Sequence, residues 1–170
     1  MDTTNYSELL PVVNENGDVV GKTTRKEAHG PAKPLHPVVH LHVFNSKGEL
    51  YLQKRPEWKD VQPDKWDTAT GGHVDYGETI DEALAREVGE ELGIAGYEPA
   101  FLGRYVFESN VERELVHVYR TVYDGEIVPN ADELDGGRFW TPREIADAIG
   151  KGVLTPNFES EYKRFFLCKQ

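Results

Sequence analysis

The sequence has one cysteine, Cys168, among its 170 residues. A single cysteine cannot form a disulfide within the chain or supply the paired thiolates of a cysteine zinc site. No apolar run approaches the roughly 18 residues that a membrane-spanning helix needs. The first residues, MDTTNYSELL, contain neither a basic region nor a long apolar stretch. We therefore expect a cytoplasmic protein that is neither secreted nor inserted in a membrane.

Clustered positive charge is also missing. The chain has 19 lysines and arginines against 30 aspartates and glutamates, a formal net charge of −11, and no basic block stands out. Because contacts to a nucleic-acid backbone need clustered cations, we do not expect a nucleic-acid polymer as a partner. The negative charge would also repel a small phosphate compound unless a cation lies between the two.

The length suits one well-buried core and is too short for two. Short apolar runs in residues 9–20 surround Asn16-Gly17, which predicts a hairpin, and residues 23–29 predict a short helix. Residues 38–45 and 49–55 predict a second hairpin, of central strands.

Two pairs of polar residues lie on the second predicted hairpin. His40 and His42 share one face of the first strand, as candidate metal ligands or as half-buried histidines with backbone partners. Lys54 and Arg55 end the second strand, where they are candidates to bind a substrate's phosphate oxygens. The alternative is that both are exposed strand-end cations.

After residue 94 the pattern alternates between strands and helices. Residues 101–107, 115–123 and 138–140 predict strands. Thr141-Pro142 and Thr155-Pro156 each predict a helix that begins with a capping residue followed by proline.

The most informative stretch runs from residue 72 to 94, GHVDYGETIDEALAREVGEELGI. It opens with the predicted turn Gly71-Gly72. Apolar residues then recur at helical spacing, at Ile80, Ala83, Leu84 and Val88. Thr79 and Glu82 fit a capping box, and Gly93 suits the left-handed end of a helix. The predicted helix spans about 79–92.

Three carboxylates project from nearly one face of this helix, those of Glu87, Glu90 and Glu91. Like charges at this spacing repel, by roughly a few tenths of a kcal/mol per pair. A hard cation such as Mg²⁺ would neutralise them, since it prefers oxygen ligands. The alternative is a solvated acidic face.

Gly72, Glu78 and the run from Arg86 to Ile94 match every fixed position of the Nudix box, so the chain resembles the Nudix hydrolase family. The resemblance implies an α/β/α sandwich with a mixed β-sheet, in which the box forms a loop, a helix and a loop. It implies a small-molecule diphosphate substrate and Mg²⁺ or Mn²⁺ as cofactor. The implied metal ligands are Glu87, Glu90, Glu91 and the carbonyl of Gly71, and Arg86 orients acidic groups of the box.

In the same comparison, residues 1–170 form a single domain. Residues 1–36 are an N-terminal extension with a hairpin, and residues 37–170 are the Nudix core. Glu87 is the first candidate for the base that takes a proton from water, and Glu112 or Glu114 is the second. The oligomeric state is open, a homodimer included.

A narrower resemblance is to type I isopentenyl-diphosphate isomerases, which share the Nudix fold. It rests on the run Arg25 to His29, on His36 and the strand after it, and on Gly72-His73 and Glu112-Arg113-Glu114. It implies a second metal site, whose ligands would be His29, His36, His73, Glu112 and Glu114. Three imidazoles with two carboxylates suit Mn²⁺, Zn²⁺ or Fe²⁺ better than Mg²⁺.

The chain differs from the isomerases at two positions that carry out their chemistry. Where the isomerase has a cysteine that moves a proton at carbon, this chain has Gly71, and glycine cannot carry a proton. Where the isomerase has a late tryptophan, residues 155–158 read TPNF. The leading hypothesis is therefore metal-dependent hydrolysis of a diphosphate linked to another group. The alternatives are isopentenyl-diphosphate isomerisation and a module that binds a nucleotide without cleaving it.

Overall fold

A computed structural model describes residues 8–59, 62–132 and 134–167. Its main sheet has the strand order β5-β4-β3-β8-β7, with β6 paired to β3 and β9 paired to β4. The strands are β3 (Leu35–Phe44), β4 (Leu50–Lys54), β5 (Trp66–Thr68), β6 (Thr70–His73), β7 (Ala100–Glu108), β8 (Arg113–Val122) and β9 (Gly137–Trp140). Strands β3 and β8 run parallel, whereas β6 and β7 pair antiparallel with their neighbours. The predicted mixed sheet is confirmed.

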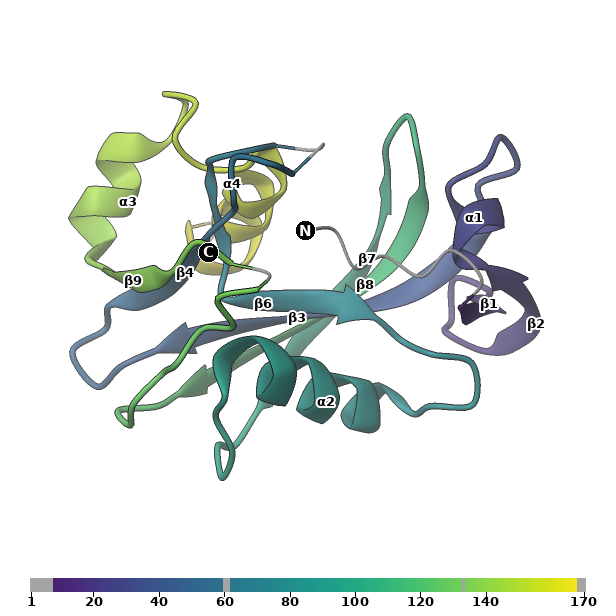
Figure 1. Cartoon of the computed structure of the whole chain (residues 1–170), viewed down its shortest axis with the longest axis horizontal. Helices are drawn as coiled ribbons and strands as arrows, with labels where there is room; N and C mark the ends of the chain where they lie inside the picture. The colour runs from purple at the N-terminus through teal and green to yellow at the C-terminus, as the bar shows by residue number, and fades with distance from the viewer. Residues whose placement is uncertain (1–7, 60–61, 133, 168–170) are drawn as a thin grey trace.

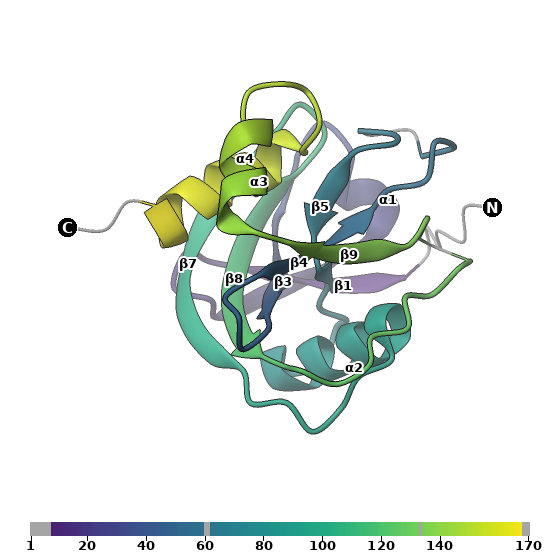
Figure 2. The same cartoon turned by 90° about the vertical axis from the view of Figure 1, so that its left-hand side faces the viewer.

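Helices cover both faces of this sheet (Figure 1). Helix α2 (Ile80–Leu92) lies against one face, and α3 (Pro142–Ala148) and α4 (Pro156–Tyr162) lie on the other side, as Figure 2 also shows. Helix α4 continues as a π-helical segment, Lys163–Leu167. The predicted α/β/α layers are therefore present.

Side chains along β3 point alternately to the two faces of the sheet, so each face contributes its own side chains to the interior. Val39, Leu41 and Val43 belong to the apolar cluster that includes the buried side of α2. Successive side chains of a strand point to opposite faces, so His40 and His42 point toward the layer of α4. The two faces thus differ in chemistry, one apolar beneath α2 and one carrying histidines.

Helix α2 has the predicted ends. The Thr79 side chain accepts from the Glu82 N–H while the Glu82 side chain accepts from the Thr79 N–H, which completes the capping box. Gly93 adopts a left-handed conformation at the C-terminus, with φ of 65°. Such conformations are strained for residues with a side chain, so this glycine ends the helix at the predicted place.

The N-terminal hairpin is confirmed as a separate two-stranded sheet. It consists of β1 (Leu9–Val13) and β2 (Val19–Thr24), which pair antiparallel. The short helix α1 (Arg25–Ala28) follows, capped by Thr24 and Glu27. The division of the chain at residue 36 stays a prediction.

One local prediction was wrong, and the predicted second hairpin is present but short. Residues 70–73 form β6 instead of a turn at Gly71-Gly72, because this segment pairs with β3, Gly71 opposite His40. Strands β3 and β4 do not form an extended hairpin, since only Phe44 and Leu50 pair between them. Strand β4 pairs instead with β5 and β9. In both places long-range pairing outweighs local turn preference. Across the described ranges, no helix is both long and apolar enough to cross a membrane.

Candidate active site

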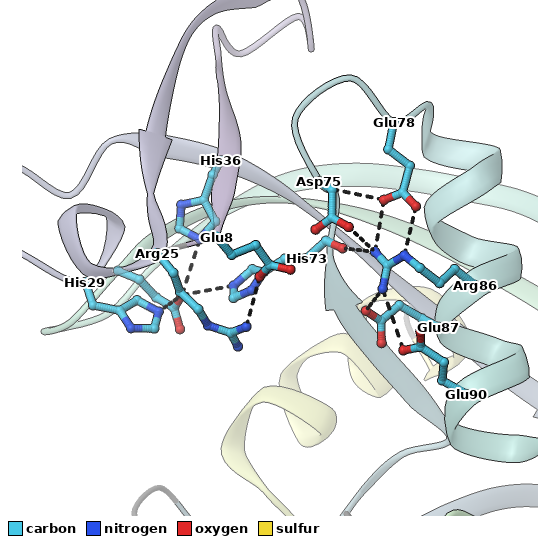
Figure 3. Close-up of polar contacts among 11 residues, drawn as sticks. Glu8, Arg25, His29, His36, His73, Asp75, Glu78, Arg86, Glu87 and Glu90 are labelled. Carbon is cyan, nitrogen blue, oxygen red and sulfur yellow. Dashed lines mark hydrogen bonds and ion pairs between the residues drawn. The ribbon is translucent and has the colours of Figure 1, made fainter. Parts of the chain in front are cut away.

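Arg86 organises the acidic groups at the start of the box (Figure 3). Its guanidinium donates two hydrogen bonds to Glu78, at 2.8 and 2.9 Å, and one to Glu87 Oε1 at 2.7 Å. It also donates to the His73 carbonyl at 3.0 Å. The hydrogen bonds from Arg86 hold the pKa of Glu78 below its ordinary value. Arg86 therefore fixes the orientation of two carboxylates, which is the role predicted for it.

The other two box carboxylates lie in different surroundings. Glu91 is 8% exposed and accepts hydrogen bonds from the Thr70 hydroxyl and, at 3.2 Å, from the Gly71 N–H. Glu90 has a side chain that is 59% exposed and lies 3.7 Å from Arg86. Gly72 faces Glu87 so closely that a Cβ there would collide with the Glu87 carboxyl group. The second glycine of β6 thus leaves room for this carboxylate.

The densest group of metal-ligand atoms lies elsewhere. His36, His73, Glu112 and Glu114 each offer one such atom, and these atoms all lie within 4.8 Å of one another. In the described part of the chain, the box glutamates do not form a group of this kind. We call these four residues the histidine–glutamate cluster.

Three imidazoles approach one oxygen of Glu112 in this region. Glu112 Oε1 lies 3.2 Å from His29 Nε2, 3.3 Å from His36 Nε2 and 3.8 Å from His73 Nε2. The five residues predicted for a second metal site are therefore neighbours, although His29 is not one of the four that converge most closely. They come from the residue after α1, from β3 and β6, and from the residues at the start of β8, so local sequence patterns alone could not show that they converge.

His36 has a tautomer fixed by its backbone contact. Its Nδ1 lies 3.0 Å from the Pro34 carbonyl, which can only accept, so Nδ1 carries a proton. In the neutral ring, Nε2 would then present a lone pair to the negative Glu112. Burial favours the neutral ring, yet the hydrogen bond to Glu112 and that to Pro34 outweigh it and raise the pKa of His36. The lone pair on Nε2 and the negative carboxylate of Glu112 would repel each other. A cation between them, either a proton or a metal ion, removes this repulsion.

Burial and charge shift the pKa values of the other cluster members in different directions. Burial lowers the pKa of His73. Burial would raise the pKa of Glu112, but the hydrogen bonds from His36 and His73 outweigh it and lower that pKa. Burial and the neighbouring charge of Glu112 raise the pKa of Glu114 to about 7. At neutral pH the cluster therefore holds one firmly ionised carboxyl group, that of Glu112, and one that is about half protonated, that of Glu114.

His73 joins the cluster to the box. Its ring approaches Glu112 while its carbonyl accepts from Arg86, and Figure 3 shows it between the two groups. Consequently the cluster and the box share one residue of β6.

Lys54 and Arg55 have acidic partners close by. Lys54 Nζ lies 3.0 Å from Asp64, and Arg55 Nη1 lies 3.8 Å from Asp67. A phosphate would have to compete with these carboxylates, so their role in substrate binding stays a prediction.

A buried glutamate that sequence reasoning missed binds the two strand histidines. Both His40 and His42 contact the carboxylate of Glu161 on α4, so their partner is not the backbone. A signal was present, because Phe158, Glu161 and Tyr162 recur at helical spacing and all are buried. Glu161 thus occupies a core-facing position of its helix.

Comparison with known proteins places this geometry in a family. The chain is 34% identical over 156 residues to the Nudix hydrolase lmo0368 of Listeria monocytogenes, covering 89% of this chain and 90% of that protein. It is 33% identical over 135 residues to an isopentenyl-diphosphate Delta-isomerase of Saccharopolyspora erythraea, covering 76% and 70%. The crystal structure of DR0079 from Deinococcus radiodurans matches with a TM-score of 0.79 at 28% identity, covering 94% of this chain and 99% of that one.

The NUDIX domain profile matches residues 34–159, which begin just before β3 and end within α4. This range contains the complete box, the sheet that carries it and the whole histidine–glutamate cluster. The chain therefore belongs to the Nudix hydrolase family.

Proposed function

We propose that this protein hydrolyses a diphosphate linked to another group, with Mg²⁺ or Mn²⁺ held by Glu87, Glu90, Glu91 and the carbonyl of Gly71. The observation that supports this most is the arrangement of the complete box. Arg86 fixes Glu78 and Glu87, and Glu91 is held against β6 by the Gly71 N–H. Such prepositioning lowers the cost of assembling a charged site.

The donors fit a hard divalent cation. All are oxygens, and Gly72 leaves the space that the Glu87 carboxyl group occupies. Such a cation makes a water more acidic and offsets the charge that develops on the leaving phosphate. The net charge of −11 also favours a cation-dependent site, because an anionic substrate would otherwise be repelled.

A carboxylate must accept the proton that the attacking water loses. Glu87 is the first candidate, because Arg86 orients it from the same turn of α2. Glu114 is the second, since its pKa of about 7 lies near neutral pH, where a general base works best.

For the histidine–glutamate cluster we propose a second divalent ion, Mn²⁺, Zn²⁺ or Fe²⁺, with His29 beside the four converging residues. The mixed nitrogen and oxygen donors suit such ions. His36 also donates its other ring N–H to a backbone carbonyl, an arrangement common among histidines that bind metals.

Isomerisation of isopentenyl diphosphate is the second candidate function. The converging cluster and a relative named isopentenyl-diphosphate Delta-isomerase favour it. Gly71 argues against it, because the side chain that would move a proton at carbon is missing there. A nucleotide-binding module without catalysis is a third candidate, which the complete box disfavours.

A screen of diphosphate compounds tests the proposal. Nucleoside diphosphates and triphosphates, sugar nucleotides, coenzymes and isoprenoid diphosphates are each incubated with Mg²⁺ or Mn²⁺, and phosphate or pyrophosphate release is measured. We expect release from at least one class, and none in EDTA. Isopentenyl diphosphate is also incubated in D₂O, where deuterium on carbon without phosphate release would favour the isomerase. Tight metal-dependent binding with no product of either kind would favour the binding module.

A further inference from the structure

Strand β7 forms one edge of the main sheet. Among the described strands it pairs with β8 alone, and Figure 2 shows it at the margin of the sheet. No backbone group of residues 100–108 bonds to the backbone of any other described segment. Every second residue of β7 therefore directs its N–H and C=O groups outward, away from β8. Such an edge is a template on which a further strand can pair.

The second half of β7 lacks the features that commonly block pairing at an edge. Residues 100–108 contain no proline. The register with β8 shifts between Phe101 and Gly103, so the strand continues regularly over residues 104–108. Phe165 of the π-helical segment lies where a Cβ of Gly103 would project, which is over the face of the strand and not along its edge. Residues 104–108 can therefore accept a partner strand.

Three side chains of this half point to one side of the sheet, those of Arg104, Val106 and Glu108. Arg104 is exposed, and the described residues offer it no carboxylate within ion-pair distance. Val106 is 38% exposed. The Glu108 side chain is 53% exposed, and although its Oε2 lies 2.8 Å from Lys33, its Oε1 lies no closer than 3.8 Å to Arg113. A second cation can therefore approach Oε1, so the strand presents a cation, an apolar residue and an anion in turn.

This order of side chains is complementary to itself when the strand is reversed. Residues opposite each other on antiparallel strands face the same side, so a twofold axis between two copies of β7 must pass through one residue position. An axis at residue 104 would set Arg104 opposite itself. Axes at residues 105 and 107 would set Val106 opposite Arg104 and Glu108 respectively. Among the positions 104–107, only the axis at Val106 sets Arg104 of each copy opposite Glu108 of the other.

Two exposed apolar residues outside this half favour the same axis. Phe101 is 57% exposed and Val111 is 50% exposed. They lie five positions before and five positions after Val106, so the axis there brings Phe101 of one copy toward Val111 of the other. Burial of exposed apolar surface thus supports the register that the charges indicate.

We propose that β7 is the surface through which two copies of this chain associate, antiparallel about Val106, so that the two sheets continue across a twofold axis. The same patch then serves both copies, which closes the assembly at two chains. The inference is independent of the proposed function, because neither the box nor the histidine–glutamate cluster takes part. The paired segment is short, and small interfaces are weak, so we expect a dissociation constant of about 10–500 µM.

Analytical ultracentrifugation at about 5 µM to 1 mM protein measures this association. In about 0.15 M salt, charge is screened over about 8 Å, so the net charge of −11 on each copy acts weakly. Arg104→Glu sets two pairs of negative charges opposite each other, and Glu108→Arg sets two pairs of positive charges. Each variant alone should dimerise about 10-fold or more weakly than the wild type. An equal mixture of the two restores both opposite pairs and should dimerise more tightly than either variant alone.

Arg143→Glu is the matched control. It makes the same change in charge at an exposed residue of α3, which follows β9 at the far side of the sheet from β7. Its dissociation constant should stay within about twofold of the wild type. A wild-type protein that is monomeric at 1 mM would overturn the proposal, and the edge would then be free or covered by a strand of another protein. Dimerisation that Arg104→Glu does not weaken would also overturn it, because another surface would be responsible.

Cysteine cross-linking tests the register. In a Cys168→Ser background, Val106→Cys places two thiols opposite each other at the axis, where oxidised glutathione should link them into a dimer. Arg104→Cys is the control, because its two thiols would lie four positions apart along the strands, about 13 Å. Thermal unfolding checks that each variant is folded. Equal cross-linking of the two variants would contradict the axis at Val106.

Discussion

The carboxylates on the two faces of the sheet have different kinds of partner. Beneath α2, the box carboxylates lie within one short segment, and those of Glu78, Glu87 and Glu90 share Arg86, a cation that is always charged. On the face toward α4, Glu112 and Glu161 are bound mainly by histidines, which come from the end of α1, from β3 and from β6. The first face therefore carries a permanent cation of its own, whereas the balance of charge on the second face depends on the protonation of histidines.

The largest effect should follow from removing the carboxylate that the second face depends on most. Glu161→Ala leaves a cationic His40 and two further donors buried without their acceptor, and we expect a loss of about 3–5 kcal/mol in the free energy of unfolding. Urea denaturation measures this loss. Glu90→Ala, on the exposed side of α2, should cost no more than about 0.5 kcal/mol. Similar losses in the two variants would remove the contrast between the faces.

Substitutions of the box carboxylates should lower activity and leave stability nearly unchanged. Glu90→Gln and Glu91→Gln keep the size of the side chains but remove negative charge, so we expect kcat/KM to fall by about 100-fold or more. Thermal unfolding monitors the fold, which should be retained. Full turnover in either variant would show that its carboxylate is not part of the metal site.

Stabilisation by a metal ion should depend on different residues on the two faces of the sheet. Mn²⁺ at about 100 times the dissociation constant of a site should add about 2.7 kcal/mol per occupied site to the stability of the wild type. Part of this gain should disappear in Glu112→Gln, from the histidine–glutamate cluster, and persist in Glu91→Gln. Equal gains in wild type and Glu112→Gln, measured by thermal unfolding after EDTA treatment, would argue against a second ion.

Gly71 and His40 should show energetic coupling, because they compete for one space. Gly71→Ala should cost about 1–3 kcal/mol of stability, since the ring held by Glu161 cannot easily move away. In a His40→Ala background the same substitution should cost clearly less. Additive costs in a double-mutant cycle would show that the ring does not occupy this space.

The smallest change in the free energy of unfolding should come from a change in pH alone. The pKa of His40 is raised from 6.5 to about 9, so its contribution to stability is fully present below pH 6.5 and is lost as pH rises through 9. The pKa of Glu161 is lowered from 4.5, because the interactions with His40 and His42 outweigh burial, so its contribution is present above pH 4.5 and is lost on acidification. The stability difference between wild type and Glu161→Gln should therefore be largest between pH 4.5 and 6.5. A difference that does not change up to pH 10 would contradict this.

The same contrast explains what the sequence could predict. Helix α2 was predicted closely because Thr79, Glu82 and Gly93 act through local contacts. The role of Glu161 was missed because it depends on strand residues about 120 positions earlier, which no local pattern reveals. Residues 70–73 were misjudged for the same reason, since pairing with β3 decides their conformation. The cluster ligands were found through family resemblance, and only the fold brings His36, His73 and Glu112 together.

The two glycines of β6 have an evolutionary consequence. Because neighbouring residues of a strand face opposite sides, a new side chain at position 71 meets His40, whereas one at position 72 meets Glu87. The Gly71 N–H that binds Glu91 would persist with any replacement except proline. A lineage could therefore change the side chains on one side of the sheet, by exchanging residues 71 and 40 together, while the box side chains on the other side are inherited intact.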